Sequence, residues 1–210
     1  MTDIEEYIEQ HIDREPALLH EIYRVTNLTS TYPHMCSGHA QGRLLKMFMR
    51  MIKPMRVLEI GTFTGYSALC IAEGLPEGGV LHTIEIDDEA EDFIRENFSK
   101  SEFGERIILH IGDVAVVLPT IEGDFDVAFI DANKRNYVEY YDMVKPRVKA
   151  GGFIIADNTL WAGKVADTEA KHDPQSVGIH SFNNHVAADA DVEKVIVPIR
   201  DGITIIHKLI

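Results

Sequence analysis

Two β-branched segments of this chain end in clusters of polar side chains. The first cluster begins at Asp131, and the second is the pair Asp157-Asn158. In an open parallel sheet, ligands bind beyond the carboxyl ends of the strands, and adjacent strands lie about 4.8 Å apart, so these side chains can converge. Two carboxylates held together repel each other, which favours a bound cation between them. The candidate ligands are oxygens, with no thiolate or imidazole, so Mg²⁺, Ca²⁺ or Mn²⁺ is favoured over zinc. The pattern therefore predicts a divalent-cation site, with Mg²⁺ preferred; the alternative is that the aspartates only cap loops.

Lys134 lies three residues beyond Asp131 and therefore close to the predicted cation. A neighbouring positive charge and partial burial both lower the pKa of an amine, so Lys134 is the candidate general base. Trp161 closely follows the second polar cluster, where it either forms a wall of the site or packs in the core. Three histidines of the C-terminal part have irregular spacing and are predicted to be surface or loop residues. They are His172, His180 and His185.

A glycine turn directly follows the first predicted strand, in the sequence VLEIGTFTGYS of residues 57–67. Gly61 and Gly65 allow the backbone to come close to a ligand before the next helix begins, which favours nucleotide binding. The spacing is G-x-x-x-G, whereas the dinucleotide fingerprint is G-x-G-x-x-G, so NAD is disfavoured. The alternative is that both glycines serve only the turn.

Acidic residues follow the next two predicted strands. Glu85 lies about 24 residues after the glycine turn begins, where a carboxylate in a Rossmann-like sheet accepts hydrogen bonds from both ribose hydroxyls. Asp87 and Asp88 are predicted to be N-cap acids of the following helix. Asp113 either caps its own helix or accepts a hydrogen bond from an adenine amino group, and the sequence leaves both open.

Short β-branched runs alternate with amphipathic stretches from about residue 56 onward, which predicts an α/β sandwich with a mostly parallel sheet. The predicted strands are Val57–Ile60, Val80–Ile86, Ile107–Ile111, Val127–Ile130, Phe153–Ala156, Val195–Val197 and Ile203–Ile206. The predicted helices between them are Tyr66–Glu73, Asp88–Ser99, Asp113–Leu118, Asn136–Val148 and His180–Ala188. Only about five residues, Pro198–Gly202, separate the last two strands, and they include the turn signal Asp201-Gly202. This connection is too short for a parallel crossover, so the two strands should form an antiparallel hairpin.

Residues 1–53 precede the first strand and are predicted to form two or three helices. The candidates are Asp3–His11, Pro16–Asn27 and Ala40–Ile52. The longest segment without clear periodicity is Leu160–Ile179, whose polar composition makes it a candidate lid or substrate loop. The chain has no internal repeat and no low-complexity linker, so we expect a single domain.

The charge balance restricts the class of partner. The 210 residues include 20 Lys and Arg against 34 Asp and Glu, a net charge of -14, which argues against a general binder of nucleic acid or anionic membrane. No stretch approaches the roughly 18 apolar residues of a membrane helix, and the acidic start MTDIEEYIEQ is unlike a signal peptide. Cys36 and Cys70 fit a reducing compartment, so we expect a cytosolic protein.

Taken together, these residues resemble the class I, cation-dependent O-methyltransferases, the group that contains the catechol and caffeoyl-CoA enzymes and many small bacterial relatives. The resemblance covers nearly the whole chain and is carried by VLEIGTFTGYSAL, FIDANKRNY, IADNTLWAGKV, PIRDGITIIHK and HMCSGHAQGRLL. It implies a Rossmann-like three-layer sandwich with a seven-stranded, mostly parallel sheet, an antiparallel last strand and extra N-terminal helices. Residues 1–53 would form a helical lid or dimer region, and residues 54–210 the core of one S-adenosylmethionine-dependent methyltransferase domain.

The resemblance also implies a role for each matching residue. The implied cation ligands are Asp131, Asp157 and Asn158, and the implied catalytic base is Lys134. The implied S-adenosylmethionine-binding residues are Met35, Ser37, Glu59, Gly61, Phe63, Ser67, Glu85, Ile86, Asp113, Val114, Asp131 and Tyr137. Among them, Glu85 would bind the ribose, and Gly61 and Ser67 the methionine moiety. Asp113 and Val114 would lie at the adenine edge.

The implied acceptor is a hydroxyl of a catechol-like small molecule, that is, a vicinal diol, and the resemblance to the caffeoyl-CoA type implies a homodimer. A second alternative is a tRNA hydroxyuridine O-methyltransferase. The acidic balance counts against it, but a basic stripe could support it: Arg43, Lys46, Arg50, Lys53 and Arg56. A third alternative, from another class, is a non-methyltransferase nucleotide-binding or NAD-dependent domain.

Overall fold

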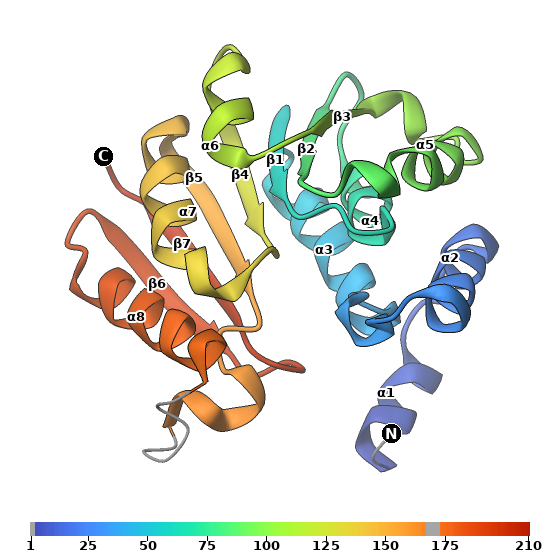
Figure 1. The fold of residues 1–210 in the computed structure, drawn as a ribbon, viewed down its shortest axis with the longest axis horizontal. Helices are drawn as coiled ribbons and strands as arrows, with labels where there is room; N and C mark the ends of the chain where they lie inside the picture. The colour runs from blue at the N-terminus through green and yellow to red at the C-terminus, as the bar shows by residue number, and fades with distance from the viewer. Residues whose placement is uncertain (1–2, 167–172) are drawn as a thin grey trace.

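The computed structural model describes residues 3–166 and 173–210. Its central element is a seven-stranded sheet with the order β3-β2-β1-β4-β5-β7-β6. The strands are β1 (Arg56–Ile60), β2 (Val80–Glu85), β3 (Ile107–Ile111), β4 (Phe125–Ile130), β5 (Val148–Asp157), β6 (Val192–Val197) and β7 (Ile203–Lys208). All neighbouring strands pair in parallel except β7, which runs antiparallel to both β5 and β6 (Figure 1). The predicted Rossmann-like sheet with a reversed last strand is confirmed.

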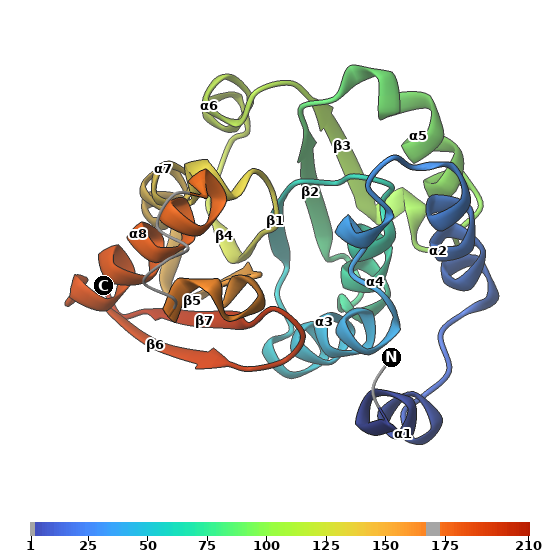
Figure 2. The same cartoon turned by 60° about the horizontal axis from the view of Figure 1, so that its bottom comes forward.

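Helices cover both faces of this sheet (Figures 1 and 2). They are α1 (Asp3–His11), α2 (Ala17–Thr29), α3 (His39–Ile52), α4 (Tyr66–Gly74), α5 (Glu91–Ser99), α6 (Val114–Val117), α7 (Tyr137–Val144) and α8 (Pro174–Ala188). Side chains of α2–α5 pack in one apolar cluster and those of α6–α8 in another. Val57 and Leu58 of β1 point into different clusters, because successive side chains of a strand alternate between its faces. None of the helices in the described residues is long and apolar enough to cross a membrane.

Helix α8 begins earlier than the sequence predicts. It starts at Pro174, so the last part of the predicted loop Leu160–Ile179 is helical. Asp173 caps the helix by accepting a hydrogen bond from the backbone N–H of Gln175 (3.1 Å), and proline suits the first helical position because its N–H would have no partner there. The loop prediction was wrong here because the first turns of α8 are polar or small and lack a clear apolar stripe.

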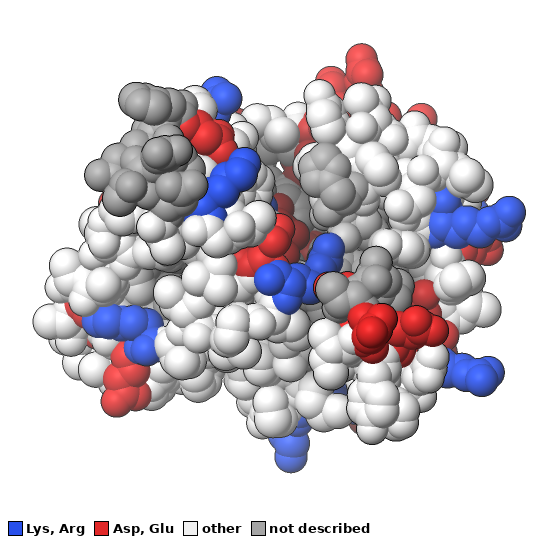
Figure 3. Space-filling model, turned by 90° about the horizontal axis from the view of Figure 1, so that it is seen from below, with Lys and Arg blue, Asp and Glu red and all other residues white. Residues whose placement is uncertain are grey.

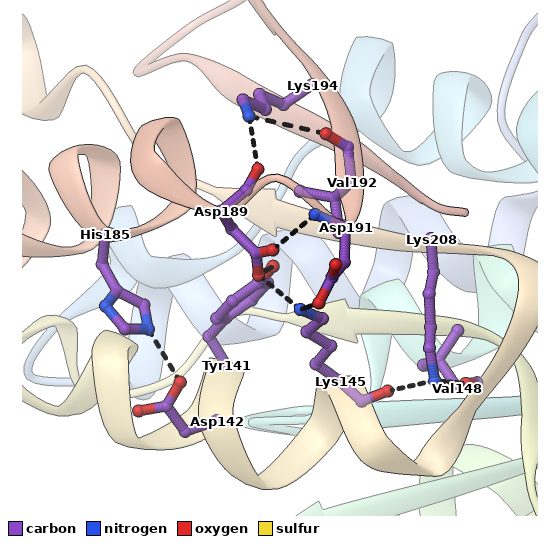
Figure 4. Close-up of polar contacts among 10 residues, drawn as sticks. All are labelled: Tyr141, Asp142, Lys145, Val148, His185, Asp189, Asp191, Val192, Lys194 and Lys208. Carbon is purple, nitrogen blue, oxygen red and sulfur yellow. Dashed lines mark hydrogen bonds and ion pairs between the residues drawn. The ribbon is translucent and has the colours of Figure 1, made fainter. Parts of the chain in front are cut away.

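A polar cluster pins α7 to the turn between α8 and β6 (Figure 4). Lys145 Nζ donates hydrogen bonds to Asp189 Oδ2 (2.6 Å) and Asp191 Oδ2 (3.1 Å), and the Tyr141 hydroxyl also donates to Asp189 Oδ2 (2.8 Å). Burial alone would raise the pKa of Asp189, but these donors and the Asp191 N–H outweigh it and lower the pKa to about 2. The cluster therefore fixes α7 and α8 over the sheet through a carboxylate that must stay ionised.

Asp189 should consequently make stability sensitive to acid. Its folded pKa lies below the unfolded value of 3.8, so its contribution is complete above about pH 4 and is lost as the pH falls towards 2. We expect Asp189→Asn to lower the free energy of unfolding by about 1 kcal/mol at pH 6 and to flatten its decline in acid. Guanidinium unfolding followed by Trp161 fluorescence measures both.

Asp142→Asn is the matched control, because Asp142 pairs with His185 (2.8 Å) at an exposed site where ion pairs contribute little. Equal acid sensitivity in Asp189→Asn and the unsubstituted protein would contradict this account of the cluster.

Candidate active site

The carboxyl ends of β1 and β4 meet where the strand order of the sheet reverses. The Asp131 N–H donates to the Ile60 carbonyl (2.9 Å), and the Gly61 N–H donates to the Ile84 carbonyl (3.0 Å). Gly61 has a φ of +95°, and a Cβ there would lie 2.1 Å from the Asp131 carbonyl oxygen. The neighbouring backbone therefore requires glycine at this position, whether or not a ligand is bound. Such a reversal point is where open α/β sheets bind their ligands.

A cavity of about 1030 Å³ opens at this end of the sheet. Figure 3 views the molecule from below, where acidic and basic side chains gather around a central hollow. The cavity is as large as the larger small-molecule sites of proteins. The predicted site residues that line it are Met35, Ser37, Gly61, Phe63, Ser67, Glu85, Ile86, Asp113, Val114, Asp131, Lys134, Asp157 and Asn158. One continuous space thus joins the glycine turn to the two polar clusters.

The register between β4 and β5 brings the two aspartates together. Ile130 pairs with Ala156, so the residues that follow this pair are Asp131, directly after β4, and Asp157, the last residue of β5. Burial and then the charge of Asp131 raise the pKa of Asp157 well above its usual range, because both disfavour a second negative charge. Asn158 follows with a left-handed φ of 57°, a conformation that asparagine tolerates.

The side-chain oxygens of Asp131, Asp157 and Asn158 are suitable ligands for a hard cation that keeps part of its water shell. Within the described residues, no group of three or more His, Cys, Asp or Glu side chains could hold a metal ion. Asp131 and Asp157 supply only two carboxylates, so further ligands would have to come from the Asn158 amide, water or a substrate. Mg²⁺ commonly binds proteins through one or two carboxylates with several waters retained.

Lys134 is nearly buried beside this pair, and its Nζ donates a hydrogen bond to Asp131 Oδ1 (2.7 Å). Burial lowers the pKa of Lys134, but the attraction of the Asp131 carboxylate outweighs it and raises the pKa above its usual value. The sequence predicted a lowered pKa because it placed a cation next to the amine and did not include this ion pair. Lys134 therefore lies where the sequence predicted, with the opposite shift in pKa.

Glu85 organises the other end of the cavity. Its Oε2 accepts hydrogen bonds from the backbone N–H groups of Thr62 (3.0 Å) and Phe63 (2.7 Å), and its Oε1 accepts from Ile86 (2.9 Å) and Asp87 (3.0 Å). Four backbone donors on one carboxylate hold the glycine turn in a single shape. The carboxylate also lines the cavity, at the position that the resemblance assigns to the ribose.

The remaining acids behave as helix caps. Asp113 accepts a hydrogen bond from the Ala115 N–H (2.7 Å) and so caps α6, while its side chain also lines the cavity. Asp87 likewise accepts from the Glu89 N–H (3.1 Å) at the start of the next helical segment. The predicted cap at Asp88 is wrong, because Asp88 is already the first residue of that segment. Contact of Asp113 with adenine stays a prediction.

Two predicted cofactor-binding residues, Glu59 and Tyr137, lie behind the cavity wall. Glu59 is fully buried and accepts hydrogen bonds from the hydroxyls of Ser67 (2.6 Å) and Thr83 (2.5 Å). The Tyr137 hydroxyl donates to the Asp157 backbone carbonyl (3.0 Å). Both side chains are shielded from the cavity, so they support residues that line it.

Two residues of the site were given no role by the sequence analysis, although both lie in segments that carry the family resemblance. Gln41 Nε2 donates to Asp157 Oδ2 (2.6 Å), and Arg200 Nη1 donates to Gln41 Oε1 (2.7 Å). They come from segments 159 positions apart, and neither belongs to a spaced cluster of reactive groups. Only the tertiary fold brings them to Asp157.

Trp161 lines the cavity, and its indole N–H donates to Asp173 Oδ2 (3.2 Å). The wall alternative for Trp161 is therefore the one that the structure supports. His180 and His185 are exposed on α8, as surface residues. His172 lies outside the described residues.

Comparison with known proteins identifies the family. The sequence profile of the O-methyltransferase family matches residues 9–209. The chain is 34% identical to tricin synthase 1 of Oryza sativa subsp. japonica, over 95% of this chain and 84% of that protein, and 31% identical to a caffeoyl-CoA O-methyltransferase of Stellaria longipes, over 93% and 85%. The chain belongs to the O-methyltransferase family.

Solved structures agree with this assignment. The O-methyltransferase TomG of Streptomyces achromogenes, solved with S-adenosylmethionine, superposes with a TM-score of 0.90 at 25% identity and full coverage of both chains. An O-methyltransferase of Bacillus cereus with S-adenosylhomocysteine gives a TM-score of 0.90 at 26% identity, over 99% of this chain and 97% of that one. The protein is thus an S-adenosylmethionine-dependent O-methyltransferase, and the alternative of an NAD-dependent or non-methyltransferase domain is wrong.

Glu59 offers a test of how the site is built. Burial raises its pKa from 4.5 to about 8, so the folded protein binds a proton that the unfolded chain releases. The free energy of unfolding should therefore fall as the pH rises from about 4.5 to 8. Glu59→Gln imitates the protonated carboxyl, so it should remain folded and lose this pH dependence. Chemical unfolding at pH 5 and pH 8 compares the two proteins, and identical slopes would contradict the buried, protonated state.

Proposed function

We propose that this enzyme transfers the methyl group of S-adenosylmethionine to one hydroxyl of a catechol-like small molecule, with the help of a divalent cation. The observation that carries the proposal is the meeting of Asp131, Asp157 and Lys134 in the cavity that begins at the glycine turn. A vicinal diol offers two adjacent oxygens, which is what a cation with open coordination positions can bind.

The cofactor would occupy the part of the cavity next to Gly61 and Glu85. S-adenosylmethionine, when bound there, supplies an electrophilic methyl group. Glu85 would accept hydrogen bonds from the ribose hydroxyls, and Ser67, which Glu59 holds in place, would contact the methionine moiety. Met35 lies half exposed on the cavity wall and would cover that end of the ligand. The chain thus contributes mainly orientation, which can supply much of a rate enhancement.

The cation would be held by Asp131, Asp157 and Asn158. When bound, it supplies positive charge that favours the ionised form of a phenol, whose pKa is ordinarily near 10. Relief of the repulsion between the two carboxylates supports this assignment, because burial and Asp131 both oppose ionisation of Asp157.

Lys134 Nζ would accept the proton of the reacting hydroxyl. Its position beside Asp131 supports this role, since it lines the cavity and lies next to the proposed metal ligand. Engagement of the Asp131 charge by a cation would remove the main cause of the raised pKa of Lys134. Trp161 on the same wall would help to exclude water from the acceptor.

Relatives support a phenolic acceptor. The relatives include tricin synthases and caffeoyl-CoA O-methyltransferases, which are 31–35% identical over 93–95% of this chain. We extend to this chain only the chemical class that their names have in common, an aromatic hydroxyl. The homodimer and the cytoplasmic location stay predictions.

Removal of the base or of a ligand should separate binding from turnover. We expect Lys134→Ala and Asp157→Ala each to lower kcat on a catechol by about 100-fold or more, because proton transfer and charge stabilisation are lost. The affinity for S-adenosylhomocysteine, measured by calorimetry, should change little. Lys100→Ala, at the exposed C-cap of α5, is the control that keeps full activity. Undiminished turnover in EDTA would rule out the cation.

The basic stripe gives the tRNA alternative little support, because most of its side chains are hydrogen-bonded within the protein. Arg43 Nη2 (2.7 Å) and Lys46 Nζ (2.6 Å) both donate to the Glu73 carboxylate, and Arg50 donates to the Glu73 carbonyl (3.0 Å). Arg56 is likewise hydrogen-bonded to the Glu122 carbonyl (2.6 Å). Most of the stripe is therefore engaged in internal contacts and is not presented as a phosphate-binding surface.

Methyl transfer from labelled S-adenosylmethionine with Mg²⁺ should consequently reach small catechols and not tRNA. We expect incorporation into caffeate and related diols at least 100-fold above that into bulk tRNA at equal concentration. Guaiacol-type monophenols, in which the second hydroxyl is already methylated, are the control for the need of two adjacent oxygens. Preferential labelling of tRNA would favour the alternative instead.

A further inference from the structure

A chain of hydrogen bonds runs from the surface of the hairpin to Asp157. Arg200, in the turn between β6 and β7, donates from Nη1 to Gln41 Oε1 (2.7 Å) and from Nη2 to the Cys36 carbonyl (3.3 Å). Gln41, near the start of α3, donates from Nε2 to Asp157 Oδ2 (2.6 Å). Gln41 and Asp157 are only 1% and 2% exposed, so water does not compete for this contact.

Arg200 decides which way the Gln41 amide points. An amide side chain carries one acceptor and one donor group, and a guanidinium can only donate. The arginine must therefore face Oε1, which leaves Nε2 directed at Asp157. With the amide reversed, two oxygens would face each other across the same short distance. The arginine thus guarantees that a donor meets the carboxylate.

The two donors on Asp157 hold its carboxylate in one orientation. Oδ1 accepts from the Asn158 N–H (2.8 Å), and Oδ2 accepts from Gln41. Each oxygen has two lone pairs, so each keeps one for a ligand on the cavity side. Hydrogen bonds of this kind orient metal-binding side chains, and their removal typically costs 10- to 100-fold in metal affinity.

The backbone at Arg200 indicates that its side chain is needed. Its φ is 48°, in the left-handed region that favours glycine, so an arginine is strained there. Both of its described hydrogen-bond partners are neutral oxygens, so its charge is not cancelled by a carboxylate among them. A charged donor forms a stronger hydrogen bond than a neutral one, so the contact with Gln41 is stronger than a neutral side chain would make.

We propose that Gln41 is a positioning residue that fixes the Asp157 carboxylate for cation binding, and that Arg200 acts on the site through Gln41. This inference depends on the proposed cation-dependent function. It deepens that function by extending the metal site to two residues from distant parts of the chain. Gln41 lies behind the cavity wall, whereas Arg200 is among the residues that line the cavity, and its proposed effect on the cation passes through Gln41.

A double-mutant cycle on metal binding tests the proposal. Mn²⁺ is titrated into the full-length protein with saturating S-adenosylhomocysteine, and free Mn²⁺ is counted by electron paramagnetic resonance. We expect Gln41→Met, which keeps the side-chain volume, to weaken Mn²⁺ binding about 10-fold or more. Arg200→Met should weaken it several-fold in the unsubstituted protein and have no further effect in Gln41→Met, because Arg200 acts only through the amide.

Arg147→Met is the matched control. Arg147 lies just before β5 and donates hydrogen bonds to three backbone carbonyls. Asp157 is the last residue of β5, so Arg147 lies at the opposite end of the strand from the proposed cation site. Its loss should lower stability and leave Mn²⁺ affinity unchanged. Affinity for S-adenosylhomocysteine and far-ultraviolet circular dichroism verify folding, and Gln41→Asn, too short to span both partners, replaces Gln41→Met if that variant does not fold.

The outcomes separate this inference from the proposed function. An unsubstituted protein that binds no Mn²⁺ overturns the cation-dependent function itself. If it binds Mn²⁺ and the folded Gln41 variants bind equally well, the role of Gln41 is refuted while the function stands. If Arg200→Met has the same effect in both backgrounds, Arg200 does not act through Gln41.

Discussion

The register between two parallel strands is the constraint on which the site depends. Because β4 and β5 pair Ile130 with Ala156, the aspartate that follows β4 and the aspartate that ends β5 lie at the same level of the sheet. Burial makes the proximity of two carboxylates unfavourable. The Lys134 ammonium, which binds Asp131, and the Gln41 amide, which binds Asp157, offset part of this repulsion. The sheet therefore holds two carboxylates closer together than their mutual repulsion favours, and a bound cation can stabilise such a pair.

The cofactor end of the cavity is built on a different principle. There, backbone groups fix the shape of the site. Glu85 accepts hydrogen bonds from four backbone N–H groups, and Gly61 allows close contact with the backbone at the end of β4. Glu59 supports this wall from behind through its hydrogen bond from Ser67, whereas Tyr137 supports the reacting end through its hydrogen bond to the Asp157 carbonyl. A rigid binding end and a charged reacting end in one space suit an enzyme that must align a methyl donor with an oxygen acceptor.

Several features were predictable because they depend on local order along the chain. Alternating β-branched and amphipathic segments predicted the seven strands, and the five-residue connection before β7 required an antiparallel hairpin. The start of α8 escaped prediction because its apolar residues are too sparse to show a helical period, although the cap Asp173 and Pro174 were visible in hindsight. The predicted direction of the shift in the Lys134 pKa was also wrong. The ion pair with Asp131 raises this pKa by more than burial lowers it.

The sequence by itself determined the order of the elements, the glycine turn and the polar residues that end β2, β4 and β5, because each of these is written in adjacent or regularly spaced residues. Tertiary structure alone decided that Gln41 would contact Asp157 and Arg200 would contact Gln41, and that Glu59 and Tyr137 would lie behind the cavity wall. It also decided that Glu73 would bind Arg43, Lys46 and Arg50 of the basic stripe. Such contacts join segments with no common period, so their partners are chosen by the packing of helices on the sheet and by the paths of the connecting loops.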